Sequence, residues 1–174
     1  MEYKIRLEEI KKKGIRDDNY CTVMSSAIAF NTTFEKMQKI YFDYGRKRFK
    51  GFSFASIIDD LANEFNCKVK KYMFRPFKCT AENRSFYVDV KNDKNRYYAP
   101  RITPNNASDY LPNGNYILGV YRHVLSFKNG IVEDWTEGRK HQVNWIYEIL
   151  KQDQKRYDPL EELENNFDLN DFDF

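Results

Sequence analysis

The dipeptide Asn129-Gly130 constrains the fold of this chain more than any other feature, because two runs of strand-forming residues flank it. Asn-Gly between such runs is the strongest short-range signal for a β-hairpin. We therefore predict strands over Tyr116–Phe127 and Ile131–Trp135, joined by a two-residue turn. That turn sets the register, which places Lys128 opposite Ile131, Phe127 opposite Val132, Leu125 opposite Asp134, and His123 opposite Thr136.

Side chains of a strand alternate between its two faces, so the hairpin has one apolar and one polar face. The polar face carries Arg122, Ser126, Lys128 and Glu133. The apolar face carries Tyr121, His123, Leu125, Phe127, Val132 and Asp134. His123 and Asp134 are diagonal neighbours on the apolar face, close enough to touch. A buried carboxylate without a partner is costly, so we expect a His123–Asp134 pair, which would orient the imidazole for base chemistry.

Cys21 is the candidate nucleophile. Asp17, Asp18 or Asn19 can cap a helix, and Cys21 then falls in its first turn. Backbone N–H groups and the helix dipole favour thiolate at that position. Combined with His123 and Asp134, it would form a Cys-His-Asp arrangement that attacks an acyl carbon to give a thioester. Taken singly, Cys21 would more often be a small buried hydrophobe and His123 a core histidine.

The remaining pattern predicts helices first and strands afterwards, which is the α+β class. Residues 4–13 can form a helix that ends at Gly14. Further expected features are an inward stripe of Met24, Ala27, Ile28 and Asn31, a helix capped by Thr32 or Thr33 with Phe34, Met37, Ile40 and Tyr41 inward, and a helix capped by Ser53 with Ile57, Ile58, Leu61 and Phe65 inward. Strands are expected over Cys67–Phe74, Ser85–Val90 and His141–Ile149, with a long irregular connection over 91–114.

The charge of the chain is divided unevenly. Residues 158–174 carry seven acidic residues and no basic one, whereas residues 1–157 carry 29 basic against 19 acidic residues, a net of +10. We therefore expect one domain over 1–157 and an acidic tail over 158–174. This division suggests either an anionic partner or a tail that folds back on the domain. The basic stretches 11–13, 46–50 and 68–78 include aromatic residues, so nucleic-acid binding is a further alternative to a solvated surface.

Several classes of site are disfavoured. Three cysteines and two histidines lack metal-ligand spacing, so neither a metal nor another cofactor is expected. The N-terminus does not resemble a signal peptide, and no apolar run approaches the length of a membrane span. We expect a soluble cytosolic protein with free thiols, in which Cys67 and Cys79 are structural, His141 is a surface residue, and Trp135 and Trp145 serve packing.

An ordered set of segments resembles small papain-like cysteine-peptidase-type proteins encoded largely by bacteriophages. The segments are Tyr20-Cys-Thr-Val-Met-Ser-Ser-Ala-Ile-Ala-Phe30, Gly45-Arg-Lys-Arg-Phe-Lys-Gly-Phe-Ser-Phe54 and Pro112-Asn-Gly-Asn-Tyr-Ile-Leu-Gly-Val-Tyr-Arg-His-Val-Leu-Ser-Phe-Lys-Asn-Gly-Ile-Val-Glu-Asp134, within roughly residues 15–136. The resemblance implies a papain-like fold with Cys21 as nucleophile, His123 as general base and Asp134 as its orienter. The function we expect is a thiol hydrolase that acts on a peptide, isopeptide or other amide bond, in the cytoplasm of an infected host or in a virion.

The chain departs from that family at two places. Relatives often carry Arg where this chain has Met24, and the papain pattern has a Gln in the region of Ile15 and Arg16. The expected oxyanion donor is therefore Asn19 or a backbone N–H near Cys21.

The alternative is a non-catalytic phage protein, structural or host-interacting, that docks through its acidic tail. The tail ends Asp171-Phe-Asp-Phe174 and resembles the acidic tips of single-stranded-DNA-binding proteins, which recruit protein partners. Its other reading is a disordered, solubilising segment.

Overall fold

The computed structural model describes residues 2–73, 102–135 and 141–151. Its elements are α1 (Glu2–Lys12), α2 (Cys21–Ala29), α3 (Phe34–Asp43), the 3-10 helix η1 (Phe54–Ser56), α4 (Ile58–Glu64), β1 (Cys67–Met73), the 3-10 helix η2 (Pro104–Asp109), β2 (Asn115–Val120), β3 (His123–Lys128), β4 (Ile131–Glu133) and β5 (Trp145–Lys151). Helices combined with an antiparallel sheet confirm the predicted α+β class. The predicted strand 85–90, Cys79 and the acidic tail 158–174 lie outside the described residues.

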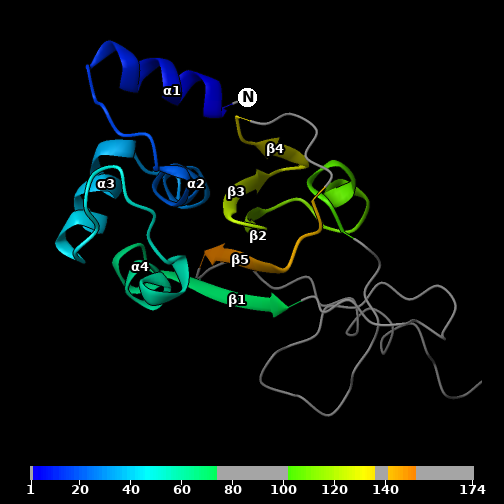
Figure 1. Ribbon diagram of the computed structural model, residues 1–174. Coiled ribbons are helices and arrows are strands. Elements are labelled where there is room, and N and C mark those ends of the chain that lie inside the picture. Colours follow the sequence, from blue (N-terminus) through cyan, green and yellow to red (C-terminus); the bar gives the residue numbers. More distant parts are fainter. Residues whose placement is uncertain (1, 74–101, 136–140, 152–174) are drawn as a thin grey trace, which may run out of the picture.

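The five strands form one antiparallel sheet in the order β1-β5-β2-β3-β4. The last strand, β5, therefore lies inside the sheet, between β1 and β2 (Figure 1). The prediction of a strand over 141–149 began four residues too early. Before the strand begins, the N–H groups of Val143 and Asn144 donate to the carbonyls of Ile102 and Gly119, both at 2.8 Å.

The Asn129-Gly130 turn joins β3 to β4 as predicted. Both residues have positive φ, 49° and 82°, as a two-residue hairpin turn requires. Phe127 pairs with Val132 and Lys128 with Ile131, which confirms the predicted register at the turn. β4 ends at Glu133, so the ladder stops before Asp134.

The expected single strand over Tyr116–Phe127 was wrong. It is divided into β2 and β3 by a second tight turn at Tyr121-Arg122, where Arg122 has φ 53° and Val120 pairs with His123. No Gly, Asn or Asp marks this turn, which is why turn chemistry did not predict it. Tyr121 is 64% exposed, so its predicted place on the apolar face was also wrong.

Both faces of the sheet are covered, so the predicted polar face was wrong as well. Helices α1 to α4 lie on one side and η2 on the other (Figure 1). Ser126 and Glu133, expected on the polar face, are buried. The helical side buries Met24, Ala27, Ile28, Phe34, Met37, Tyr41, Leu61, Ile117 and Tyr147, among others. The η2 side buries Ile102, Ala107, Leu111, Tyr116, Leu118, Leu125, Phe127 and Ile146, among others.

The helix ends agree only partly with the predictions. Gly14 follows α1 with φ 66°, and the Thr33 hydroxyl accepts the N–H of Lys36 at the start of α3, both as predicted. By contrast, Tyr20 is the N-cap of α2, Ile57 is the N-cap of α4, and Asn31 is exposed. Asp17 and Asn19 do not cap α2, because their side chains bind the loop around Phe49 instead.

The predicted long connection contains an ordered element. Thr103 and Asn106 form a capping box at the start of η2, and Ala107 and Leu111 pack against the sheet. A cluster of Asn, Asp and Pro residues resembles a loop in sequence, but here it closes one side of the core. No helix within the described residues is long and apolar enough to cross a membrane.

Among the glycines that the structure describes, Gly119 has the tightest surroundings. A Cβ placed on it would lie 1.9 Å from Cε2 of Trp145, whose indole stacks on Phe54. We expect Gly119→Ala to lower the free energy of unfolding by about 1–3 kcal/mol, because the indole or the strand must move. Urea denaturation measures this loss. Gly51→Ala is the matched control, since nothing lies within 4 Å of its Cβ position, and equal stability of the two variants would contradict the packing described.

Candidate active site

Cys21 is the first residue of α2, as predicted, and its thiol is half-buried. The helix behind it is enclosed, with Thr22 to Ala29 all buried between the sheet and the neighbouring helices. Cys21 is therefore the residue of α2 that is not fully buried. The sulfur lies against the backbone N–H of Thr22 and the backbone N–H of Val124 on β3.

His123 begins β3 and is held next to Cys21 by the residue that follows it. The backbone N–H of Val124 donates to the Cys21 sulfur, and the backbone carbonyl of Val124 accepts a hydrogen bond from the Ser25 hydroxyl at 3.1 Å. Ser25 is one helical turn after Cys21, so both groups come from the same face of α2. The start of β3 is thus fixed along the first turn of the helix, and the imidazole is 8% exposed.

Asp134 follows β4 directly and is 3% exposed. Its Oδ1 lies 2.9 Å from Nε2 of His123, so the two side chains predicted to be neighbours are in contact. Because Nε2 faces Asp134, Nδ1 is the imidazole nitrogen left for the hydrogen bond with Cys21. The structure therefore brings Cys21, His123 and Asp134 together, with His123 between the other two.

The electrostatics of the site favour charge separation between Cys21 and His123. Burial raises the pKa of Cys21, but the hydrogen bond and charge of His123, with the N–H groups of Val124 and Thr22, outweigh it, so that pKa lies below its ordinary value. Burial lowers the pKa of His123, yet its bonds to Asp134 and Cys21 raise it to about 9. A thiol whose pKa is lowered, next to an imidazole whose pKa is raised, favours a thiolate–imidazolium pair.

Trp135 covers one side of this pair. Its ring centre lies 5.9 Å from that of His123 at an interplanar angle of 81°, an edge-to-face contact. The indole is itself 60% exposed, so it stands between the imidazole and solvent. Trp135 was predicted to serve packing, but the sequence did not indicate that it packs on His123, the candidate base.

Helix α1 adds a residue that sequence reasoning missed. Tyr3 is 4% exposed and hydrogen-bonds to the Tyr20 hydroxyl, just before Cys21. Burial, Tyr20 and the nearby charges of Asp134 and Cys21 hold the pKa of Tyr3 far above its ordinary value. The Tyr3 backbone N–H donates to Oε2 of Glu133 at 2.7 Å, which ties α1 to β4. The contact between Tyr3 and Glu133 joins residues 130 positions apart in sequence, so no local pattern could have predicted it.

Asn19, predicted as the oxyanion donor, is exposed two residues before Cys21. Its side-chain Nδ2 donates to the carbonyl of Phe49 at 2.8 Å. An amide nitrogen carries two N–H bonds, and this contact uses one of them. A role for Asn19 in binding an oxyanion therefore stays a prediction.

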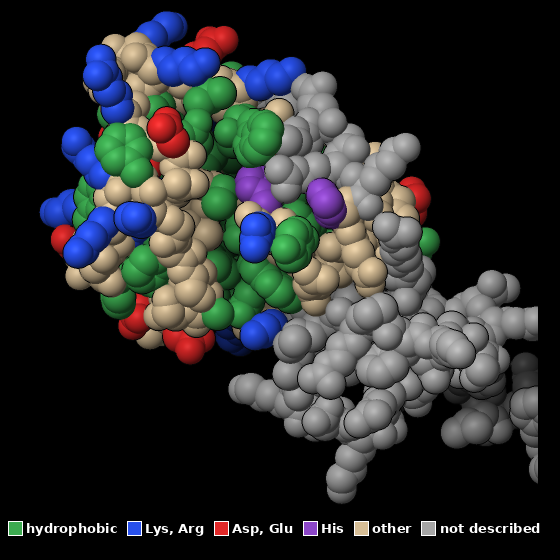
Figure 2. Space-filling view, in the orientation of Figure 1, with side chains coloured by type: hydrophobic (Ala, Val, Ile, Leu, Met, Phe, Trp, Pro, Cys, Tyr) green, Lys and Arg blue, Asp and Glu red, His purple; other side chains and the backbone are tan. Residues whose placement is uncertain are grey.

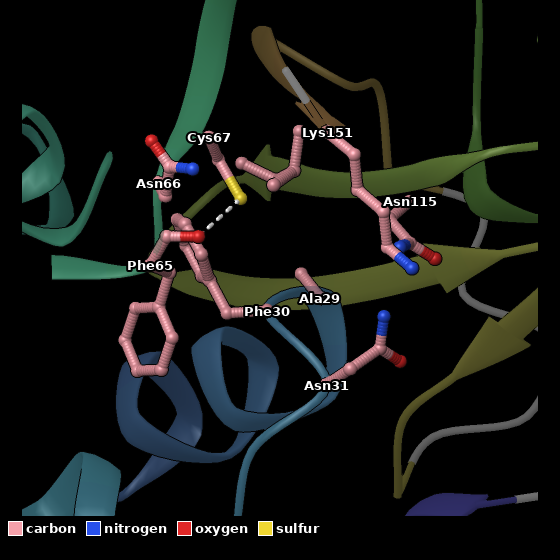
Figure 3. Close-up of a pocket in the computed structure, with 9 residues that line it drawn as sticks. Ala29, Phe30, Asn31, Phe65, Asn66, Cys67, Asn115 and Lys151 are labelled. Carbon is pink, nitrogen blue, oxygen red and sulfur yellow. Dashed lines mark hydrogen bonds between the residues drawn. The ribbon is translucent and has the colours of Figure 1, made fainter. Parts of the chain in front are cut away.

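The other cysteine within the described residues has the opposite character. Burial raises the pKa of Cys67, and its thiol donates to the carbonyl of Phe65 at 3.2 Å. It lines a cavity of about 240 Å³ at the far end of α2 from Cys21 (Figure 3). The lining residues are Ala29, Phe30, Asn31, Phe65, Asn66, Cys67, Asn115, Ile149 and Lys151. Neither this cavity nor the groove of about 640 Å³ between α3 and α4 includes the candidate site.

On the face drawn in Figure 2, Lys and Arg side chains are spread over the helical part, among acidic and hydrophobic ones. Arg46, in the glycine-flanked loop, is only 3% exposed. His141 is exposed, as predicted. Among residues 2–73, 102–135 and 141–151, no group of three or more His, Cys, Asp or Glu side chains could hold a metal ion.

Comparison of the chain with protein-family models, with curated proteins and with solved structures gave no match. The geometry around Cys21 is therefore the basis on which a function can be proposed.

Proposed function

We propose that this chain is a cysteine-dependent hydrolase of papain-like type that cleaves a peptide, isopeptide or other amide bond. One observation supports this most: His123 contacts Asp134 at 2.9 Å through Nε2, and the same imidazole hydrogen-bonds Cys21 at the start of a buried helix. An oriented imidazole next to a thiol of lowered pKa is the arrangement that activates a sulfur nucleophile.

The reaction would proceed in two steps. The Cys21 thiolate attacks the carbonyl carbon of the substrate, the C–N bond breaks, and the His123 imidazolium gives its proton to the leaving amine. The resulting thioester is attacked by water, from which neutral His123 takes a proton, and the acid product leaves. The proton taken up restores the imidazolium while sulfur leaves as thiolate, so the starting pair is regenerated. Asp134 holds the imidazole in one orientation and stabilises its charged form throughout.

The papain-like assignment is supported by the order and type of the elements that hold Cys21, His123 and Asp134. The nucleophile begins a helix packed on an antiparallel sheet. The base comes later and begins β3, and its carboxylate directly follows the adjacent strand β4. We extend the proposal to a bacteriophage protein acting in the host cytoplasm or in the virion, on the resemblance of the segments 20–30, 45–54 and 112–134. A protein or peptide is then the expected substrate.

The proposal is tested by trapping the nucleophile. The chain is incubated with a panel of peptides that end in a vinyl sulfone, a Michael acceptor to which a thiolate adds to form a stable thioether, and modified residues are located by mass spectrometry. We expect adducts on Cys21 in the native chain and none on Cys67, with the Cys21 adduct lost in His123→Ala.

Adducts formed equally on both cysteines, or only after unfolding, would contradict the proposal. The alternative would then gain support: a non-catalytic protein that keeps this geometry and docks through its acidic tail.

A further inference from the structure

A buried ion pair contacts the segment just before Cys21 in the chain. Arg46 Nη1 contacts Asp17 Oδ2 at 2.7 Å, and the two side chains are 0% and 1% exposed. Asp17 lies between α1 and α2, and Arg46 lies in the loop after α3. The pair therefore joins the loop before α2 to the loop after α3.

Asp17 and Arg46 also hydrogen-bond to the backbone of both loops. Asp17 Oδ1 accepts the N–H of Phe49 at 3.1 Å and that of Asn19 at 3.4 Å. Arg46 Nη2 donates to the carbonyl of Asn19 at 2.8 Å. Asn19 is thus bound through its N–H and its carbonyl, and its side chain returns to Phe49. Phe49 itself has φ 58°, an unusual conformation for a bulky residue, which persists only where its surroundings impose it.

Stability alone is a poor explanation for this arrangement. A buried ion pair is often no more stabilising than apolar residues of similar volume, because both charges lose their hydration. Here Arg46 Nε is also buried without a hydrogen-bond partner among the described residues, which adds a cost. What the pair does provide is a fixed path for the chain between Asp17 and Cys21.

That path determines where α2 begins. Asn19 is followed by Tyr20, the N-cap of α2, whose carbonyl accepts the N–H of Met24 at 2.8 Å. No side chain caps this helix start, so the position of Cys21 depends on how Asn19 and Tyr20 are held. Misplacement of a reacting group by about 1 Å can reduce a rate on the order of a hundredfold.

We infer that Asp17 and Arg46 are positioning residues, which act through Asn19 to place the Cys21 sulfur against His123. This role rests on the proposed function of Cys21 as nucleophile. It predicts that weakening the pair changes the reactivity of Cys21 more than it changes the stability of the fold.

The test is the rate of Cys21 alkylation by iodoacetamide across pH, together with thermal unfolding, in the full chain. Arg46→Lys keeps the charge that neutralises Asp17 but loses the planar fork that also reaches the Asn19 carbonyl. We expect it to unfold cooperatively and to alkylate Cys21 roughly tenfold more slowly at about pH 6. Asp17→Asn, which loses the charge, should show the larger loss of reactivity. Glu64→Gln is the control, because it removes an ion pair with Lys36 that is about half exposed.

The outcomes separate this inference from the proposed function. If the native chain alkylates Cys21 only at the pH of an ordinary thiol, the proposed function fails. If the native chain reacts at low pH and both variants react equally well, the positioning role fails and the proposed function stands. Loss of folding in both variants would also overturn the inference, since the pair would then serve the whole fold.

Discussion

Replacing His123 with alanine is expected to slow the alkylation of Cys21 by about tenfold or more at about pH 6. The bond to His123 and its positive charge oppose the burial that would otherwise raise the pKa of Cys21. Without the imidazole, burial is opposed only by the backbone N–H groups of Val124 and Thr22, so the thiolate forms at higher pH. The measurement is the rate of carbamidomethylation of each cysteine against pH, read by mass spectrometry of peptides.

Cys67 supplies an internal control for this experiment. Its pKa is raised by burial, and its thiol contacts Phe65 rather than any residue of the site. Its rate should be the same in the native chain and in His123→Ala, which would show that the variant is folded. Equal rates at Cys21 in the two proteins would contradict the role assigned to His123.

Asp134→Asn is expected to reduce amide hydrolysis by on the order of a hundredfold to ten-thousandfold. An asparagine can keep a hydrogen bond to Nε2, but it does not stabilise the imidazolium that the thiolate requires. The Asp134 carboxylate is the first partner that raises the pKa of His123 to about 9, so that pKa should fall in the variant. The rate at which Cys21 adds to a peptide vinyl sulfone, compared with that of the native chain, measures the loss of thiolate on which this reduction depends.

The same substitution should change how stability depends on pH. The pKa of His123 is raised in the folded chain from an ordinary 6.5 to about 9, so its protonated form stabilises the fold. That contribution is fully present below pH 6.5 and is lost as the pH rises through about 9. The comparison uses Cys21→Ala, which removes the thiolate, and the double variant Cys21→Ala/Asp134→Asn. The melting temperature of Cys21→Ala should be the higher of the two, and the difference should be largest at about pH 6. A difference that grows towards pH 9 would contradict the pairing of His123 with Asp134.

The parts of this site that the sequence predicted are those governed by local rules. Asn129-Gly130 sets the register of β3 against β4, and this brings the segments that carry His123 and Asp134 side by side. The helix that begins at Cys21 was also predicted, although its cap was not. Local rules failed at the Tyr121-Arg122 turn, where Arg122 takes a positive φ that its residue type does not signal.

The parts that could not be predicted depend on contacts between distant segments. The place of β5 inside the sheet, the packing of Tyr3 beside Cys21 and the Asp17–Arg46 pair are each set by tertiary packing. Asp17 was an attractive helix cap by residue type, but a buried guanidinium competes for its carboxylate more strongly than backbone N–H groups do. The role of the glycine-flanked basic loop therefore became visible only once Arg46 was seen to be buried.

The most direct test of the account is the protonation state of Cys21 in the native chain. The ultraviolet absorbance of thiolate is titrated with pH in the native chain and in Cys21→Ala, and the difference belongs to Cys21. We predict that this absorbance is present at a pH well below the ordinary thiol pKa of 9.0 and that it moves to higher pH in His123→Ala. If it appears only near or above that pH, Cys21 is an unactivated thiol and the site is not a nucleophilic one.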